Sequence, residues 1–257
     1  MKTKTEIVND WLPRYTGRKL EDFDKYILLT NFSHYLDLFS EWHNDAEIIG
    51  KDKPMPNVSA NGITLINFGI GSPNAATIMD LLSAINPNAV LFLGKCGGLK
   101  KKNKVGDLII PIAAIRGEGT SDDYLPAEVP ALPAFSLQRA VSSTIKNSSC
   151  DYWTATVYTT NRRVWEFDKR FKKYLQKTRS MAVDMETATI FIVGFANQIP
   201  SGALLLVSDQ PMISTGVKTQ ESDKDVDVNY VENHLKIGIN SLLELINNGL
   251  SVKHLRF

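Results

Sequence analysis

The most informative stretch of the chain is AVLFLGKCGG, at residues 89–98. Its first five positions are all apolar, which is typical of a strand that is covered on both faces of a sheet. Residues 203–207, with the sequence ALLLV, repeat this pattern. Strands of this kind belong to parallel sheets with helices on both sides, so the two stretches predict an α/β fold.

Short apolar runs and helical patterns alternate along the rest of the chain. The other predicted strands cover residues 26–29, 63–68, 107–115 and 153–158. The predicted helices run from about residue 72 to 85, 133 to 145, 186 to 197 and 229 to 247, with Gly249 past the last one. Because no repeat or linker divides the chain, we predict a single α/β domain with a mixed, mostly parallel central β-sheet flanked by helices.

Three segments have no clear pattern: roughly the first 20 residues, residues 117–131 and residues 214–227. The last is rich in Lys, Glu, Asp and Ser, which predicts a mobile surface loop. A loop of this length either closes over a site as a lid or is a plain surface segment, and composition does not separate the two.

Composition excludes several classes of protein. The 257 residues include 29 basic and 28 acidic side chains, so no basic excess favours nucleic acid as a partner. No apolar run approaches the roughly 18 residues of a membrane span, and the N-terminal residues lack the apolar core of a signal peptide. Two cysteines, Cys96 and Cys150, form neither a disulfide framework nor a four-cysteine metal site. We expect a reduced, cytoplasmic protein without a metal or cofactor.

The sequence GIGSPN at residues 69–74 joins a predicted strand to a predicted helix. Gly69 and Gly71 allow the backbone to approach a ligand, and the free N–H groups of a helix start favour an anion or a hydroxyl. Ser72 is the predicted N-cap, with Pro73 in the first turn. The turn misses the last glycine of the dinucleotide fingerprint, so no nicotinamide cofactor is expected. A tight turn without any ligand is the alternative.

A second glycine cluster, GKCGG, occupies residues 94–98. Three glycines in five positions cost chain entropy, which indicates a backbone constraint at this point. The cluster is not a Walker A loop, because Cys96 follows Lys95 where Ser or Thr is required. Cys96 is either a nucleophile or a small packed thiol, and the absence of a nearby histidine in the sequence favours the packed thiol.

Two acidic residues follow predicted strands. Glu186, in AVDMETAT at residues 182–189, stands at a helix start, where it either accepts hydrogen bonds from sugar hydroxyls or is simply favoured by the helix dipole. Asp209 ends the apolar strand 203–207, at the edge where open α/β sheets bind ligands. Burial there raises a carboxyl pKa, as a general acid needs, although a turn or N-cap aspartate is the alternative.

Taken together, the four motifs resemble the nucleoside phosphorylase and nucleosidase superfamily, in which they occur in this order. Within it, the chain is most similar to the short bacterial AMP nucleosidases, through stretches such as LPRYTG at 12–17, IRGEG at 115–119 and YTTNRR at 158–163. This resemblance implies hydrolysis of AMP to adenine and ribose 5-phosphate through an oxocarbenium-like sugar. It also implies a homo-oligomer built from dimers, with a hexamer the usual form.

Departures from the phosphorylase pattern favour water as the nucleophile. The phosphorylases bind orthophosphate with arginines, whereas the corresponding positions here are TNFSHY at residues 30–35, which has no arginine, and Phe92. Their phosphate-binding serine corresponds to Lys95. Without bidentate guanidinium contacts a site binds free phosphate poorly. The alternatives are a purine nucleoside phosphorylase or nucleosidase acting on unphosphorylated nucleosides, and a nucleotide sensor without turnover.

The resemblance also implies roles for individual residues. Asp209 donates a proton to the leaving base, Glu186 binds the ribose hydroxyls and Met185 packs on the sugar. Tyr158 stacks on the base, with Val157 as the alternative. The glycines that line the sugar and the attacking water are Gly69, Gly71 and Gly97.

The 5′-phosphate of the implied substrate needs cations or helix-start amides. The residues expected there are Arg14, Tyr15, Lys95, Arg116, Arg162 and Arg163. Arg14 and Tyr15 belong to an expected N-terminal arm, residues 1–22, that reaches a neighbouring subunit. A nucleoside phosphorylase-like catalytic domain at 23–250 and a tail at 251–257 complete the expected organisation.

Overall fold

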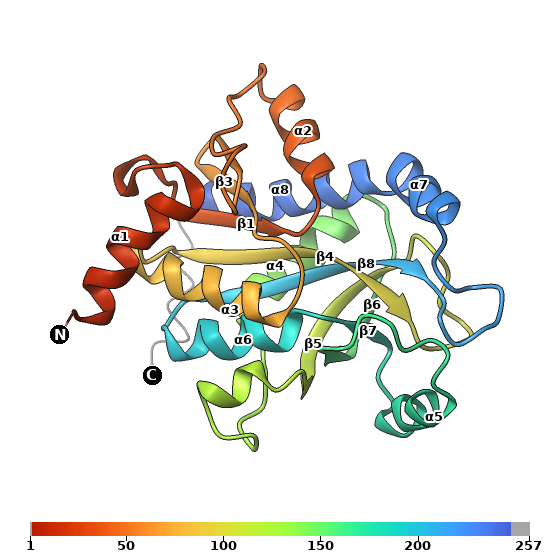
Figure 1. Cartoon of the computed structure of the whole chain (residues 1–257). Coiled ribbons are helices and arrows are strands. Elements are labelled where there is room, and N and C mark those ends of the chain that lie inside the picture. The colour runs from red at the N-terminus through yellow and green to blue at the C-terminus, as the bar shows by residue number, and fades with distance from the viewer. Residues whose placement is uncertain (1, 248–257) are drawn as a thin grey trace.

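The computed structural model of the chain describes residues 2–247 (Figure 1). The predicted tail at 251–257 and the glycine at position 249 lie outside the described residues. The strands are β1 (Tyr26–Thr30), β2 (Asn57–Ala60), β3 (Ile63–Asn67), β4 (Ala89–Gly98), β5 (Leu108–Gly117), β6 (Trp153–Thr160), β7 (Ala182–Asp184) and β8 (Ser201–Asp209). The α-helices are α1 (Lys4–Thr16), α2 (Ser33–Trp42), α3 (Ser72–Leu81), α4 (Phe135–Asn147), α5 (Lys169–Thr178), α6 (Thr187–Ala196), α7 (Gln220–Asn229) and α8 (Val231–Asn247). Within the described residues, no helix is long and apolar enough to cross a membrane.

The strands form one sheet in the order β2-β3-β1-β4-β7-β6-β5-β8, and β4 pairs in addition with β8. That extra pairing closes part of the sheet on itself. Strand β4 runs parallel to β1 and β8, and β6 runs parallel to β5 and β7. The pairings β2–β3, β4–β7 and β5–β8 are antiparallel. The predicted mixed, mostly parallel sheet is therefore confirmed.

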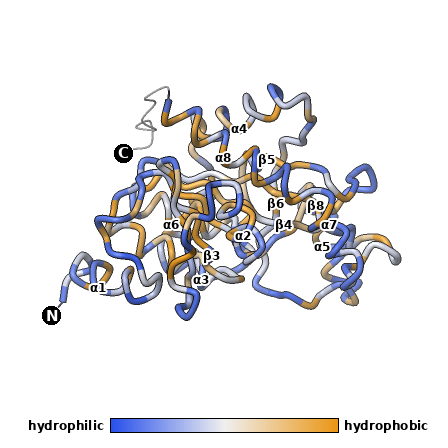
Figure 2. The backbone as a smooth tube through the Cα atoms, turned by 90° about the horizontal axis from the view of Figure 1, so that it is seen from above, coloured by the Kyte–Doolittle hydropathy of each residue, from blue (hydrophilic) through white to orange (hydrophobic). Residues whose placement is uncertain are grey.

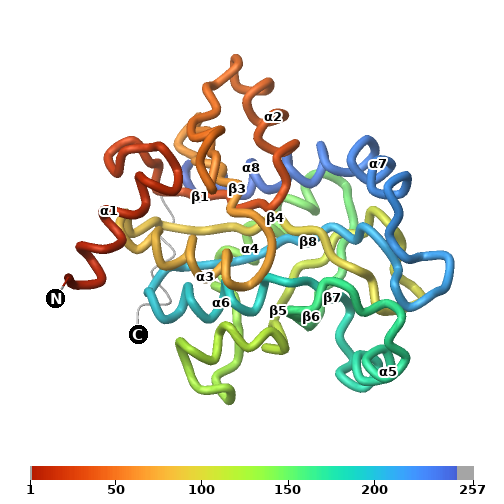
Figure 3. The backbone as a smooth tube through the Cα atoms, in the orientation of Figure 1, coloured from red at the N-terminus to blue at the C-terminus, as the bar shows by residue number. Residues whose placement is uncertain are grey.

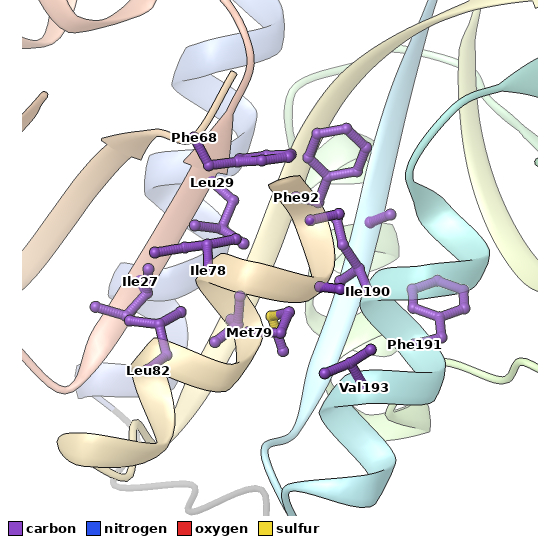
Figure 4. Close-up of a cluster of buried hydrophobic side chains, with 14 of the residues drawn as sticks. Ile27, Leu29, Phe68, Ile78, Met79, Leu82, Phe92, Ile190, Phe191 and Val193 are labelled. Atoms are coloured by element: carbon purple, nitrogen blue, oxygen red, sulfur yellow. The ribbon is translucent and has the colours of Figure 1, made fainter. Parts of the chain in front are cut away.

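The central strands are buried on both faces, as their apolar sequences predict. Val90 and Phe92 pack into a cluster with side chains of α1, α3 and α6, and Figure 4 shows Phe92 beside Phe68 and Ile190. Leu91 and Leu93 point the other way, into a cluster with α2, α4 and α8. The hydrophobic colour in Figure 2 is accordingly concentrated in the interior.

The structure differs from the predictions in the polar segments. The N-terminal segment without a pattern forms α1, whose N-cap Thr3 makes a capping box with Glu6. The expectation of a loop across 214–227 is wrong from residue 220 onward, because α7 begins there with Thr219 as its N-cap. Ser72 is not the N-cap of α3. Gly71 takes that place with φ of +97°, and the Ser72 hydroxyl donates to the Met185 carbonyl at 2.6 Å.

One buried polar contact joins the helices of the second cluster to the sheet. His234 of α8 is fully buried, and its Nε2 lies 2.9 Å from the Leu204 carbonyl oxygen while its Nδ1 lies 2.8 Å from the Tyr35 hydroxyl. A carbonyl only accepts, so Nε2 carries the proton and Nδ1 accepts from Tyr35. Burial lowers the pKa of His234 to about 4.

This contact predicts an acid-sensitive fold. The unfolded chain, with a histidine pKa near 6.5, binds more protons than the folded chain between pH 6.5 and 4. Stability from neutral His234 is therefore present above this window and is lost as the pH falls through it, by roughly 3 kcal/mol in all. In His234→Gln the free energy of unfolding, measured with urea across this window, will depend less steeply on pH. Equal slopes in the two proteins would contradict the assignment.

Candidate active site

A cavity of about 240 Å³ lies at the carboxyl ends of several strands. Its wall includes residues that directly follow β1, the last part of β4, the end of β6, the β7–α6 junction and the end of β8. This is the edge at which an open α/β sheet binds ligands. The sheet thus collects residues from five distant parts of the sequence at one place.

Glu186 is a buried acid of this pocket. It is 2% exposed and stands directly before α6. Its carboxyl accepts the Gly71 N–H at 2.8 Å and the Met185 N–H at 3.2 Å. Desolvation, with the charge of Asp184 as a smaller cause, raises the pKa of Glu186 to about 8.

Asp184 is a pocket residue that sequence reasoning missed. Its carboxylate accepts the Thr159 hydroxyl at 2.7 Å, the Thr187 N–H at 2.7 Å and the Thr187 hydroxyl at 2.5 Å. Burial raises its pKa, against the effect of these hydrogen bonds. It satisfies N–H groups at the start of α6. The sequence does carry a signal for Asp184: an acid just before a helix start is typical of a side chain that accepts hydrogen bonds from the first N–H groups of the helix.

Asp209 ends β8 and faces the same pocket. Burial is the largest cause that raises its pKa, as the sequence leads one to expect. A hydrogen bond from the Ser208 hydroxyl at 2.8 Å and the charges of Lys218 and Arg163 act in the opposite direction. The side chain is thus a carboxyl that holds its proton to higher pH than an exposed aspartate.

The predicted glycines shape the wall in different ways. Gly97 lines the pocket, and a Cβ atom there would lie 2.9 Å from Cγ of Pro211. Gly69 and Gly71 have φ of +82° and +97° and flank Ile70, which lines the pocket. A left-handed backbone favours glycine at both positions. The predicted sugar-packing residue Met185 also lies in the pocket wall.

The aromatic side chains of the pocket are not the predicted ones. Tyr158 packs against Phe171 and Tyr174, with ring centroids 6.0 and 5.9 Å away, outside the pocket wall. Val157 is buried in the core. Phe32 and Trp165 line the pocket instead. Phe32 follows β1, whereas Trp165 lies between β6 and α5 in a loop whose path depends on tertiary packing.

The predicted cations divide into two groups. Lys95, Arg162 and Arg163 line the pocket, together with Lys218, which sequence reasoning missed. Arg116 lies outside the pocket wall, and its five N–H groups are all used by the loop that follows it. Their acceptors are Ser121, Asp122 and the carbonyls of Leu125, Pro126 and Val129. Arg116 therefore has no donor left for a phosphate.

Arg14 and Tyr15 lie outside the pocket of their own chain. Both belong to α1, at the end of the molecule opposite α7 (Figure 3). Arg14 pairs with Asp10 at 3.5 Å and is largely exposed. Within residues 2–247, no group of three or more His, Cys, Asp or Glu side chains is arranged to hold a metal ion.

The fold and this pocket define a class of protein, the phosphorylase superfamily. The chain matches that superfamily over residues 28–245 and belongs to it. The resemblance inferred from the four motifs is therefore confirmed.

Within the superfamily, the similarity to AMP nucleosidases extends over most of the chain. The solved structure of an AMP nucleosidase from Bacteroides thetaiotaomicron has 60% identity and a TM-score of 0.87, covering 96% of this chain and 99% of that one. The AMP nucleosidase of Escherichia coli K12 is 30% identical over 90% of this chain, but the chain spans only 57% of that curated relative. A uridine phosphorylase from Vibrio fischeri, at 21% identity and a TM-score of 0.77 over 88% of this chain and 93% of that one, shares the fold.

The neighbouring charge of Asp184 predicts a testable shift in Glu186. In Asp184→Asn the repulsion disappears, so the pKa of Glu186 will fall from about 8 toward its ordinary value. Infrared or NMR titration of the Glu186 carboxyl measures this change. Thr187→Val is the matched control, because it removes one hydrogen bond of Asp184 and leaves the charge in place. An unchanged pKa in Asp184→Asn would contradict the electrostatic coupling.

Proposed function

We propose that the protein hydrolyses the N-glycosidic bond of AMP, giving adenine and ribose 5-phosphate. The observation that carries this proposal is the pair of acids in one pocket, Glu186 at the start of α6 and Asp209 at the end of β8. Glu186 is fixed by two backbone N–H groups, and Asp209 sits at the end of a buried strand with a raised pKa. The identity of 60% with the Bacteroides AMP nucleosidase, over nearly the full length of both chains, supports AMP as the substrate.

In the proposed reaction the bond between C1′ and the adenine nitrogen breaks ahead of nucleophile attack. Asp209 donates its proton to the leaving base, so that adenine does not depart as an anion. Glu186 binds the ribose 2′- and 3′-hydroxyls, and Met185 packs on the sugar beside it. A water oxygen then forms the new bond to C1′, and the proton that it releases restores the proton on Asp209. The backbone of Gly69, Gly71 and Gly97 borders the sugar and this water.

The aromatic and cationic residues of the pocket complete the proposal. Phe32 and Trp165 line the pocket and offer apolar faces for the base. Lys218 lines it too but is paired with Asp223 at 2.7 Å, whereas Arg162 and Arg163 line it with exposed side-chain fractions of 43% and 60%. The two arginines bring positive charge toward the 5′-phosphate. Cys96 is buried in the wall with a pKa raised by burial, which favours a packed thiol over a nucleophile.

We also propose an assembly of dimers in the cytoplasm, with Arg14 and Tyr15 reaching the pocket of a neighbouring subunit. The inner face of α1 packs on its own chain, where Lys4 pairs with Asp80 at 2.6 Å. Its outer face leaves Trp11 and Arg14 exposed. Residues 1–22 would act as the arm between subunits and residues 23–250 as the catalytic domain. Cys96 and Cys150 are both free, which fits a reducing compartment.

The direct test measures adenine released from AMP and from adenosine, each with and without orthophosphate, and identifies the sugar product. Adenine and ribose 5-phosphate from AMP alone are the expected products. Product from adenosine only when phosphate is present would mean a phosphorylase. Tight AMP binding without adenine release would mean a nucleotide sensor.

The two acids make separable kinetic predictions. Asp209→Asn will lower kcat for AMP by about 10²–10⁴-fold in a folded protein, the contribution of one general acid. Glu186→Gln will raise KM and lower kcat together, because the hydroxyl contacts act in both binding and the transition state. Asp123→Asn, which changes an exposed acid, serves as the control. Near-normal turnover in Asp209→Asn would remove it as the acid, and an unchanged KM in Glu186→Gln would contradict the hydroxyl contacts.

Arg14 is tested by comparing substrates with and without a 5′-phosphate. Loss of a charge-assisted contact in Arg14→Ala will lower kcat/KM for AMP by roughly tenfold to a hundredfold, with a much smaller effect on adenosine. Steady-state assays of both substrates measure the difference. Equal losses for the two would place Arg14 outside the phosphate site.

A further inference from the structure

Lys95 of β4 is a cation on the pocket wall that is already paired. Its side chain is 3% exposed, and its ammonium lies 2.5 Å from Oδ1 of Asp227 and 3.4 Å from Oδ1 of Asp223. The ring of Phe32 covers it at 4.3 Å. A buried ammonium that meets two carboxylates and an aromatic face has its charge largely satisfied before any ligand arrives.

Both carboxylates come from α7 and are held in place by that helix. Asp223 and Asp227 are four residues apart, so they lie on the same face. Val226, between them, is fully buried and anchors the helix. The capping box of Thr219 fixes the helix start. Lys95 is therefore met by a preorganised pair of anions rather than by a loose surface contact.

The charges around Lys95 balance. Lys218 also pairs with Asp223, at 2.7 Å, so two cations and two carboxylates form one neutral group at the edge of the pocket. An inorganic phosphate ion near Lys95 would meet both carboxylates as well as the ammonium. At such distances the repulsion offsets the attraction.

We propose that Asp223 and Asp227 are specificity-determining residues that exclude inorganic phosphate from the position at Lys95. They act as built-in counter-anions, and removing them uncovers a buried cation that takes up a free oxyanion. The consequence for catalysis, that water and not phosphate reaches the sugar, rests on the proposed function. The exclusion of phosphate from Lys95 does not rest on it.

The first test measures binding of inorganic phosphate to the full chain by isothermal titration calorimetry, without nucleotide. Asp227→Asn, Asp223→Asn and the double variant keep the side-chain size and remove charge. We expect the double variant to bind phosphate at least roughly tenfold more tightly than the unsubstituted protein. Asp225→Asn is the matched control, because it removes an exposed carboxylate from the same helix. It should not gain phosphate affinity.

A further variant identifies where the phosphate binds. Adding Lys95→Met to the double variant should abolish the gained affinity, because the uncovered cation is then absent. Equal phosphate affinity in the unsubstituted protein and in all the aspartate variants would overturn the proposal. So would a gain that survives Lys95→Met. A lower melting temperature without any gain in phosphate affinity would mean that the two aspartates only anchor α7, and would overturn it too.

The second test uses the AMP hydrolysis assay. Inorganic phosphate should inhibit the double variant at concentrations that leave the unsubstituted protein and Asp225→Asn unaffected. Equal sensitivity of all three proteins would contradict exclusion. If the unsubstituted protein releases no adenine from AMP, the proposed function fails, while the calorimetric result still decides the role of Asp223 and Asp227.

Discussion

The architecture depends on the burial of β4 on every side. Its first half pairs with β1 and β8, and its side chains alternate between two hydrophobic clusters. No polar side chain is tolerated at such positions without a partner, so Ala89–Leu93 is uniformly apolar. The helices on both faces complete the burial, and the carboxyl end of β4 is thereby fixed beside those of its neighbours. The last residues of β4, Lys95, Cys96 and Gly97, thus form part of the pocket wall.

The glycines at the end of β4 show how the strand changes partners. The register with β8 shifts between Cys96 and Gly97, and from Gly97 onward β4 also pairs with β7. A Cβ atom at Gly97 would approach Pro211 to 2.9 Å, and one at Gly98 would approach Asn103 to the same distance. Other chain segments approach these positions so closely that only glycine fits, which explains why the sequence has glycines there despite their cost in chain entropy. The same junction places β7 on one side of β4 and β8 on the other, so that Asp184, Glu186 and Asp209 line one pocket.

The sequence predicts those site residues that stand beside a local pattern, and it misses those whose position depends on tertiary packing. The buried strands, the glycine turns and the acids Glu186 and Asp209 all stand next to strong apolar patterns, and they were predicted in their correct places on the sheet. Helix α1 was missed although Thr3 and Glu6 carry a readable capping signal. Trp165 and Lys218 come from loops whose path depends on tertiary packing, so no local pattern identifies them.

Tyr158 illustrates the same limit inside a strand. Alternation along β6 gives Val157 and Tyr158 opposite directions, and neither direction leads into the pocket. Tyr158 is buried instead over Gly117, where a Cβ atom would lie 2.2 Å from its ring. Tyr158 is the aromatic residue of the motif YTTNRR at 158–163, so the sequence favours it as the base contact. The folded position of α5 shows that the Tyr158 ring already packs against Phe171 and Tyr174 of that helix.

The pocket concentrates acids at a cost to the fold. The folded pKa of Glu186 is about 8, above its ordinary value of 4.5, so the folded state binds more protons in that range. Stability linked to this group is present below pH 4.5 and is lost as the pH rises through 8, opposite in sign to His234. At neutral pH the protein therefore keeps a carboxyl that is less favourable in the folded state than in water. The N–H groups of Gly71 and Met185 offset only part of this cost, so a ligand that donates hydrogen bonds to Glu186 would offset more of it. A carboxyl with unfilled hydrogen-bonding capacity gains more free energy from a hydrogen-bonding ligand than one whose hydrogen bonds are already complete.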